Sequence, residues 1–322
     1  MKNILKQPLF FYYTIGLIVL AVNLFGFYKN SHFSTEQVKI GVTYMTMNND
    51  FYQVLNEEIE KEVLANGDKL ILRDPALDVS KQVQQVQSFI NQGVDVIIIN
   101  PVDSNDKALI AVLKQAKEAG LGIVVVDSQL KEADFVDTTI LSDNYQAGVL
   151  CAQHLLSHRT EADILLLEHA STVSGSERIQ GFLDTIEGHE SYRVVARKEV
   201  QGQTEIAMPA VQEVLRTEIA FDTVMALNDK AALGALAALE EEGNVQNVAI
   251  YGIDGSPDMK NLLATTSDVQ ATVAQTPYTM GAEAVKASYS IMAGKKLETV
   301  VLTSVTLLDQ EIIQEYDVTG WQ

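Results

Sequence analysis

The sequence predicts an α/β fold built from two lobes, each with a doubly wound parallel sheet. Short runs rich in Val, Ile and Leu alternate with amphipathic helical patterns from residue 38 almost to the end of the 322-residue chain. Strands such as Val96–Ile99 are apolar on both faces, as strands between two helix layers must be. Regular alternation of this kind gives parallel, right-handed crossovers, and the number of strands without a long linker indicates two similar lobes.

Each expected element is a hydrophobic run with period two or about 3.6, bounded by polar or turn residues. The strands are expected at 38–44, 69–73, 94–99, 122–126, 163–167, 192–197, 222–226, 248–252 and 269–274. The helices are expected near 50–65, 79–92, 105–119, 143–157, 176–187, 204–217, 229–242, 256–264 and 278–293.

The first strand leads into a loop that carries amides and aromatic rings, Asn48 to Tyr52. Open parallel sheets bind ligands at the carboxyl ends of their strands. Aromatic rings can cover the C–H faces of a polyhydroxylated ligand while amides bond its hydroxyls, so Asn49, Phe51 and Tyr52 are candidates for such a site. The alternative is that Asn49 only caps the next helix and the two rings lie in the core.

Polar side chains recur where later strands end, in the order Asn100, Asp127, Asn228, Asp254 and Gln275. Each could be a turn residue or the cap of the following helix. Because the carboxyl ends of parallel strands share one edge of a sheet, five such residues indicate a polar surface on each lobe.

Charge and cysteine content exclude several classes of protein. Lys and Arg total 23 against 43 Asp and Glu, and three of the lysines lie in residues 1–30. A surface this acidic repels phosphate backbones, which argues against a nucleic-acid partner. The single cysteine, Cys151, cannot form an internal disulfide and is expected to be a buried hydrophobe.

Residues 9–28 form an uncharged apolar run of about the length of a bilayer-spanning helix, preceded by Lys2 and Lys6. The basic bias places the N-terminus inside and the rest of the chain outside the cytoplasmic membrane. A cleaved signal peptide is the competing interpretation, but the run is long for one and no small-residue cleavage site follows it. We therefore expect one N-terminal transmembrane anchor over residues 1–30 and a polar stalk over 31–37.

Eight segments of the chain follow one another in an order typical of one protein family. They are Asn48–Tyr52, IIINPVDS (97–104), Val126-Asp127, LSDN (141–144), SERIQGF (176–182), LNDKAALGAL (227–236), GIDGSPD (252–258) and ATVAQ (271–275). With these segments, residues 38 to about 310 resemble the ribose/galactose-type periplasmic sugar-binding proteins, ribose-binding proteins above all. The resemblance implies the type 1 periplasmic binding fold, in which three crossing strands form the hinge and the sugar lies between the lobes. Lobe one would then be 38–141 and 276–304, and lobe two 142–275 and 305–322.

The resemblance also implies which side chains bind the sugar and which depart from the ribose pattern. Ser128 stands where ribose binders have an arginine, Gly202 where they have an aromatic ring, and Met45 where they have a small polar residue. The ligand is therefore expected to be another pentose or a hexose, with Gly202 leaving room for it. The implied ligand-binding residues are Asn49, Phe51, Tyr52, Asn100 and Asp127 from lobe one, Arg178, Asn228 and Asp254 from lobe two, and Gln275 at the hinge.

The resulting hypothesis is a non-catalytic extracytoplasmic monosaccharide receptor that closes over its sugar in a hinge motion, without metal or cofactor. Its partner would be the permease of a sugar ABC transporter or a membrane sensor such as a histidine kinase. An α/β enzyme using Asp127 or Asp254 is an alternative. A repressor of the same fold would need a basic helix-turn-helix where the apolar run lies. His154 and His158 are four residues apart on an expected helix and could share a metal ion. No third metal ligand is recognisable, so a solvated helix face is the simpler interpretation.

Overall fold

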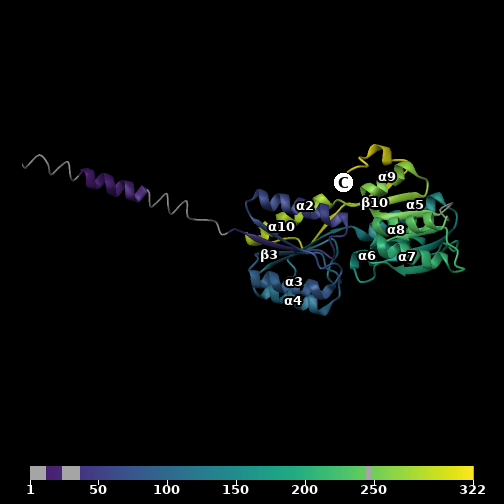
Figure 1. Cartoon of the computed structure of the whole chain (residues 1–322), viewed down its shortest axis with the longest axis horizontal. Helices are drawn as coiled ribbons and strands as arrows, with labels where there is room; N and C mark the ends of the chain where they lie inside the picture. Colours follow the sequence, from purple (N-terminus) through teal and green to yellow (C-terminus); the bar gives the residue numbers. More distant parts are fainter. Residues whose placement is uncertain (1–11, 24–36, 244–247, 322) are drawn as a thin grey trace, which may run out of the picture. The chain divides into compact units, whose positions relative to one another are not determined.

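The computed structural model describes residues 12–23, 37–243 and 248–321. The chain divides into one unit of residues 1–38 and another of residues 39–322. The second unit holds two six-stranded sheets with helices packed on them, so it consists of two α/β lobes (Figure 1).

The sheet of the first lobe has the strand order β11-β5-β4-β3-β1-β2, and all of its strand pairs are parallel. Helices α2 and α10 pack together on one face, and α3 and α4 pack together on the other (Figure 1). Thr43 pairs with Ile99, so β1 and β3 end at the same edge. The elements are β1 (Lys39–Thr43), α2 (Asp50–Ala65), β2 (Lys69–Arg73), α3 (Val79–Gln92), β3 (Val96–Ile99), α4 (Lys107–Glu118), β4 (Gly122–Val126), β5 (Thr138–Ser142), α10 (Pro277–Met292) and β11 (Val300–Thr303).

The sheet of the second lobe has the order β12-β10-β9-β8-β6-β7 and is parallel except for β12, which runs antiparallel to β10. Helix α5 packs on α6, and α7 packs on α8. The elements are α5 (Asn144–His158), β6 (Ala162–Glu168), α6 (Val173–Ile186), β7 (Tyr192–Glu199), α7 (Thr204–Leu215), β8 (Thr223–Ala226), α8 (Asp229–Glu241), β9 (Ala249–Asp254), α9 (Pro257–Thr265), β10 (Val269–Ala274), β12 (Thr306–Asp309) and the 3-10 helix η1 (Ile313–Glu315).

The chain passes from one sheet to the other after β5, after β10 and after β11. Only Ser304 and Val305 separate β11 from β12. Short connections of this kind limit the relative motion of two lobes to bending and twisting at the connections.

The strands and helices expected from residue 38 onward are all present, with bounds within three residues of those expected. The strands β5, β11 and β12 were not expected. β5 directly precedes α5 and follows an irregular loop, so it breaks the alternation of strand and helix. β11 and β12 are edge strands of four residues with mixed polar and apolar side chains, which gives them no clear period.

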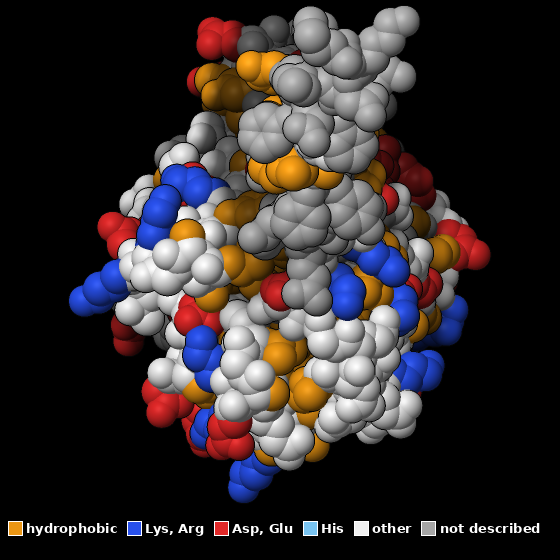
Figure 2. Space-filling view, turned by 90° about the vertical axis from the view of Figure 1, so that its left-hand side faces the viewer, with side chains coloured by type: hydrophobic (Ala, Val, Ile, Leu, Met, Phe, Trp, Pro, Cys, Tyr) orange, Lys and Arg blue, Asp and Glu red, His pale blue; other side chains and the backbone are white. Residues whose placement is uncertain are grey.

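The N-terminal unit contains a helix at residues 12–23 whose hydrophobic side chains, such as Leu17 and Val22, are exposed. Figure 2 shows hydrophobic side chains, in orange, at the surface on the side of the molecule that it draws. Within the described ranges, no helix has both the length and the apolar character needed to span a bilayer. The rest of the expected anchor, residues 1–11 and 24–30, and residues 31–36 of the expected stalk lie outside the described residues.

Two side chains on α5 test expectations from the sequence. Cys151 is fully buried in the core of the second lobe, as expected. His154 contradicts the expected solvated face, because its side chain is buried and its Nδ1 lies 3.2 Å from the hydroxyl of Tyr251. Its neighbours on other elements are Tyr251 of β9 and Asp309 of β12, which the helical spacing alone did not reveal. No cluster of three metal-ligating side chains occurs in the described parts of the chain.

Candidate functional site

A small enclosed cavity lies between the carboxyl ends of the strands of the two sheets. Its volume is about 30 Å³. Seven of the residues expected to bind a ligand line this cavity, and Asn100 and Gln275 do not. The lining comprises Met45, Asn49, Phe51, Tyr52, Asp127, His169, Thr172, Ser174, Arg178, Gln201, Gly202, Gln203, Leu227, Asn228 and Asp254.

Asp127 is the charged group that the first lobe presents to the cavity. It follows β4 and accepts hydrogen bonds from the hydroxyl of Tyr52 at 2.9 Å and from Nδ2 of Asn100 at 3.1 Å. Asn100 lies behind it, fully buried, and its Oδ1 accepts from the backbone N–H of Met45. Burial raises the pKa of Asp127, because the charged carboxylate is poorly solvated there.

Asn49 has both of the roles that the sequence allowed. Its Oδ1 accepts from the backbone N–H of Phe51 and caps α2, and its side chain also lines the cavity. Phe51 and Tyr52 are buried and meet edge to face, with ring centroids 5.5 Å apart. The capping bond and the core position of the rings therefore coexist with a place on the wall.

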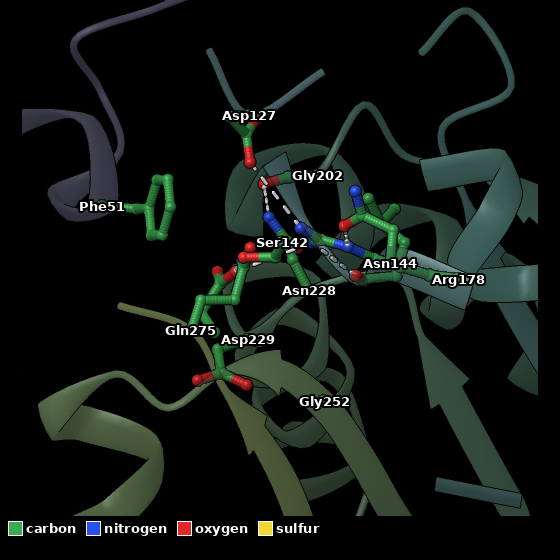
Figure 3. Close-up of polar contacts among 12 residues, drawn as sticks. Phe51, Asp127, Ser142, Asn144, Arg178, Gly202, Asn228, Asp229, Gly252 and Gln275 are labelled. Carbon is green, nitrogen blue, oxygen red and sulfur yellow. Dashed lines mark hydrogen bonds and ion pairs between the residues drawn. The ribbon is translucent and has the colours of Figure 1, made fainter. Parts of the chain in front are cut away.

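Arg178 of α6 is the cation of the site and lies between Asp127 and Asp254. Figure 3 shows its side chain with Asp127 and Asn144. Its Nη2 is 3.7 Å from Oδ1 of Asp127 in the first lobe, and its Nη1 is 3.6 Å from Oδ1 of Asp254 in the second. Its Nε donates to Oδ1 of Asn144 at 2.8 Å and its Nη1 to the backbone oxygen of Leu227 at 3.1 Å. These bonds fix a planar donor between two acceptors.

Two glycines set the position of Arg178. A Cβ on Gly148 of α5 would meet the backbone oxygen of Arg178, and a Cβ on Gly181 of α6 would meet the backbone oxygen of Tyr145. The two helices therefore approach closely only because neither glycine has a side chain. This approach brings Asn144, the first residue of α5, within hydrogen-bond distance of the arginine.

The second lobe contributes Asp254 and Asn228. Nε2 of Gln275 donates to Oδ1 of Asp254 at 2.7 Å, so Gln275 holds the carboxylate from behind. Burial raises the pKa of Asp254 well above its usual range, and Arg178 opposes that shift. Asn228 caps α8 through Oδ1, and its Nδ2 donates to the backbone oxygen of Gly202 (Figure 3).

Both site aspartates have positive φ, 64° at Asp127 and 149° at Asp254. Residues other than glycine rarely adopt these backbone conformations, which cost on the order of 1–3 kcal/mol each. Strain of this kind is typical of functional positions, and here it turns a carboxylate into the cavity at the end of β4 and at the end of β9.

The three departures from the ribose pattern have structural consequences. Gly202 has a φ of 64°, and a Cβ there would lie 2.9 Å from Nδ2 of Asn228. The room expected at Gly202 is therefore occupied by Asn228. Met45 is buried and lines the cavity. Ser128 does not line it but accepts a hydrogen bond from the backbone N–H of Ser174.

Several residues at the site were not singled out from the sequence. Asn144 lies in one of the segments that carry the family resemblance, and its Nδ2 is buried without a hydrogen-bond partner in the described chain. His169 and Gln203 come from loops after β6 and β7 and have no motif of their own. The buried Oε1 of Gln275 also has no partner among the described residues. The positions of these amides at strand and helix ends are the signal that could have identified Asn144.

Comparison with known proteins identifies the class of molecule to which this fold and cavity belong. A family model described as a periplasmic binding protein domain matches residues 40–296. The chain is also 31% identical over 280 residues to the ribose import binding protein RbsB of Bacillus subtilis, covering 86% of this chain and 88% of that protein. The chain therefore belongs to the periplasmic binding protein family, whose members bind solutes.

Two solved structures show the same fold. One is an ABC transporter solute-binding protein of Bacillus halodurans C-125 with bound myo-inositol, with a TM-score of 0.81, 25% identity, and coverage of 88% of this chain and 98% of that one. The other is the periplasmic binding component of the arabinose ABC transporter of Shewanella sp. ANA-3, bound to L-arabinofuranose. Its TM-score is 0.79, with 26% identity and coverage of 86% and 94%.

Proposed function

We propose that this chain is an extracytoplasmic receptor for a monosaccharide, a pentose or a hexose, and that it delivers the sugar to the permease of an ABC importer. The observation that carries the proposal is the placement of Arg178 between Asp127 and Asp254, one from each lobe. Carboxylates accept strong hydrogen bonds from hydroxyls, and a guanidinium donates to two oxygens at once. The related proteins are named for ribose and arabinose import.

Sugar binding requires the lobes to separate and close again. The enclosed volume of about 30 Å³ is far below the roughly 300 Å³ of small-molecule sites. We infer that the lobes open by bending at their three connections. A bound sugar then forms hydrogen bonds with Arg178 and the two aspartates, which in this structure face each other as ion pairs. We assign 38–141 and 276–304 to the first lobe, and 142–275 and 305–322 to the second.

We also propose that the N-terminal apolar run attaches the receptor to the cytoplasmic membrane, with the lobes outside. The support is the uncharged stretch at residues 9–28 with lysines before it. A tethered receptor suits either a permease or a membrane sensor such as a histidine kinase. The names of the related proteins favour the permease.

Calorimetric titration of the full-length chain with D-ribose, L-arabinose, D-allose, D-galactose and myo-inositol tests the proposal. We expect at least one sugar to bind, and Arg178→Ala or Asp254→Ala to abolish that binding while the fold is retained. Arg193→Ala is the matched control, because Arg193 is exposed and pairs with Asp163 within one lobe. No binding by the wild type, or unchanged affinity in both site variants, would reject the proposal.

A further inference from the structure

The C-terminal segment brings the only tryptophan of the chain to a wall of the cavity. The ring of Trp321 meets the ring of Phe51 edge to face, with centroids 5.7 Å apart and planes at 69°. Phe51 is 2% exposed and lines the cavity, whereas Trp321 does not line it. Trp321 therefore lies beside a ligand-facing ring.

The segment that carries Trp321 is fastened to the second lobe. Lys260 of α9 is fully buried, and its Nζ donates to the backbone oxygens of Asp317 and Gly320, at 2.6 and 2.5 Å. The carboxylate of Asp317 accepts from the backbone N–H and the hydroxyl of Thr319, which fixes the turn. Tyr316 and Val318 pack on the hydrophobic core of the second lobe, and Ile313 is part of that core.

Phe51, in contrast, belongs to the first lobe. It lies in the first turn of α2, which packs on α10, and its ring meets the ring of Tyr52. The hydroxyl of Tyr52 in turn donates to Asp127. The contact between Trp321 and Phe51 therefore joins the two lobes and lies one ring away from the charged group of the first lobe. Figure 1 marks the C-terminus between α2 and α9, in agreement with these contacts.

From this arrangement we propose that Trp321 is a positioning residue for ligand binding. It orients the Phe51 ring against the sugar and adds an aromatic contact that exists only when the lobes are closed. Edge-to-face ring pairs stabilise by more than the area they bury. The C-terminal segment thus works as a strap from the second lobe to the binding wall of the first. This inference rests on the proposed sugar-receptor function.

The test uses the full-length protein and two readouts. Because Trp321 is the only tryptophan, its fluorescence reports its surroundings without interference. We expect Phe51→Ala to shift the emission to longer wavelength, because the Trp321 ring gains exposure to water. For whichever of D-ribose, L-arabinose, D-allose, D-galactose and myo-inositol binds, we expect Trp321→Ala to raise Kd about 2- to 10-fold and Trp321→Phe to leave it within twofold.

Val318→Ala is the matched control, since Val318 lies in the same segment and packs on the hydrophobic core of the second lobe. It should lower the free energy of unfolding without changing Kd. A Kd for Trp321→Ala that equals that of Val318→Ala would overturn the inference. If no sugar binds, the receptor proposal fails. The fluorescence emission of Phe51→Ala then tests separately whether the Trp321 ring contacts the Phe51 ring. An unshifted emission would show that the two rings do not meet in solution.

Discussion

The hydroxyl of Ser128, in the first lobe, accepts a hydrogen bond from the backbone N–H of Ser174, near the start of α6 in the second lobe, at 3.2 Å. Ser104 makes the neighbouring contact, because its hydroxyl accepts from the backbone N–H of Val173 at 3.1 Å. Both serines are fully buried. Two N–H groups that a helix leaves without internal partners are thus satisfied from the opposite lobe. Ser128, one of the three departures from the ribose pattern, thus contacts the opposite lobe rather than the cavity wall.

Ser128→Ala should therefore weaken sugar binding without touching the ligand. Loss of one hydrogen bond between the lobes costs roughly 0.5–1.5 kcal/mol of the closed state, which corresponds to about a 2- to 10-fold rise in Kd. Calorimetric titration measures this change. Ser288→Ala is the control, because its buried hydroxyl bonds Ala284 within a single helix. Equal Kd values in the two variants would count against a closing role for Ser128.

Gly148→Ala should disrupt the site from behind. The added methyl group meets the backbone of Arg178 and of Phe182, so α5 and α6 must separate. We expect a loss of about 1–3 kcal/mol in the free energy of unfolding, as for other overpacked cores, together with weaker sugar binding. Urea denaturation and titration measure the two effects. Gln153→Ala, at an exposed position of the same helix, should change neither.

Asp254 should make the sugar-free protein less stable as pH rises. Burial raises its pKa well above the ordinary carboxyl value of 3.8, so in the folded state this group keeps its proton to higher pH than in the unfolded state. Stability from the bound proton is complete below that ordinary value and is lost as pH rises through the raised pKa.

The replacement Asp254→Asn keeps an acceptor for Gln275 but cannot ionise. As pH rises from 4 toward 8, the variant should therefore gain stability relative to the wild type, measured as the difference between their unfolding free energies. Urea denaturation without sugar measures that difference at each pH. Asp258→Asn, which replaces an exposed carboxylate on α9, serves as the control. A difference that stays constant with pH would show that Asp254 is ionised throughout this range.

His154 should act in the opposite direction. Burial lowers its pKa to about 4, with His158 adding to the shift and Asp309 opposing it. Unfolding lets the imidazole bind a proton below its ordinary pKa of 6.5, so stability present above pH 6.5 falls as pH drops toward 4.

His154→Gln can keep a hydrogen bond to Tyr251. In this variant the loss of unfolding free energy on acidification should be smaller by about 1–3 kcal/mol than in the wild type. Denaturation curves at pH 7.5 and pH 4.5 measure it. His189→Gln is the control, since His189 is an exposed histidine that follows α6. An equal loss in the wild type and in His154→Gln would contradict the prediction.

The sequence predicted features that are set by local residue patterns better than features that are set by contacts between segments. The long strands and helices followed from hydrophobic period, a local property. β5 did not, because it breaks the alternation of strand and helix, and β11 and β12 did not, because they are four-residue edge strands without a clear hydrophobic period. Among the candidate site residues, Asp127, Arg178 and Asp254 meet, whereas Asn100 and Gln275 lie behind the aspartates. Asp127 and Asp254 follow or end a strand, as Asn100 and Gln275 do, so position in the sequence could not separate the residues of the wall from those behind it.

By itself, the order of apolar and polar residues determined two parallel-sheet lobes with polar side chains at the ends of their strands. Only the tertiary structure decided which of these side chains face one another. Positive φ at Asp127 and Asp254, the glycine contact between α5 and α6, and the ring of Trp321 against Phe51 all depend on segments far apart in the chain. Backbone strain and close packing are properties of the folded chain, and hydrophobic period carries no information about them.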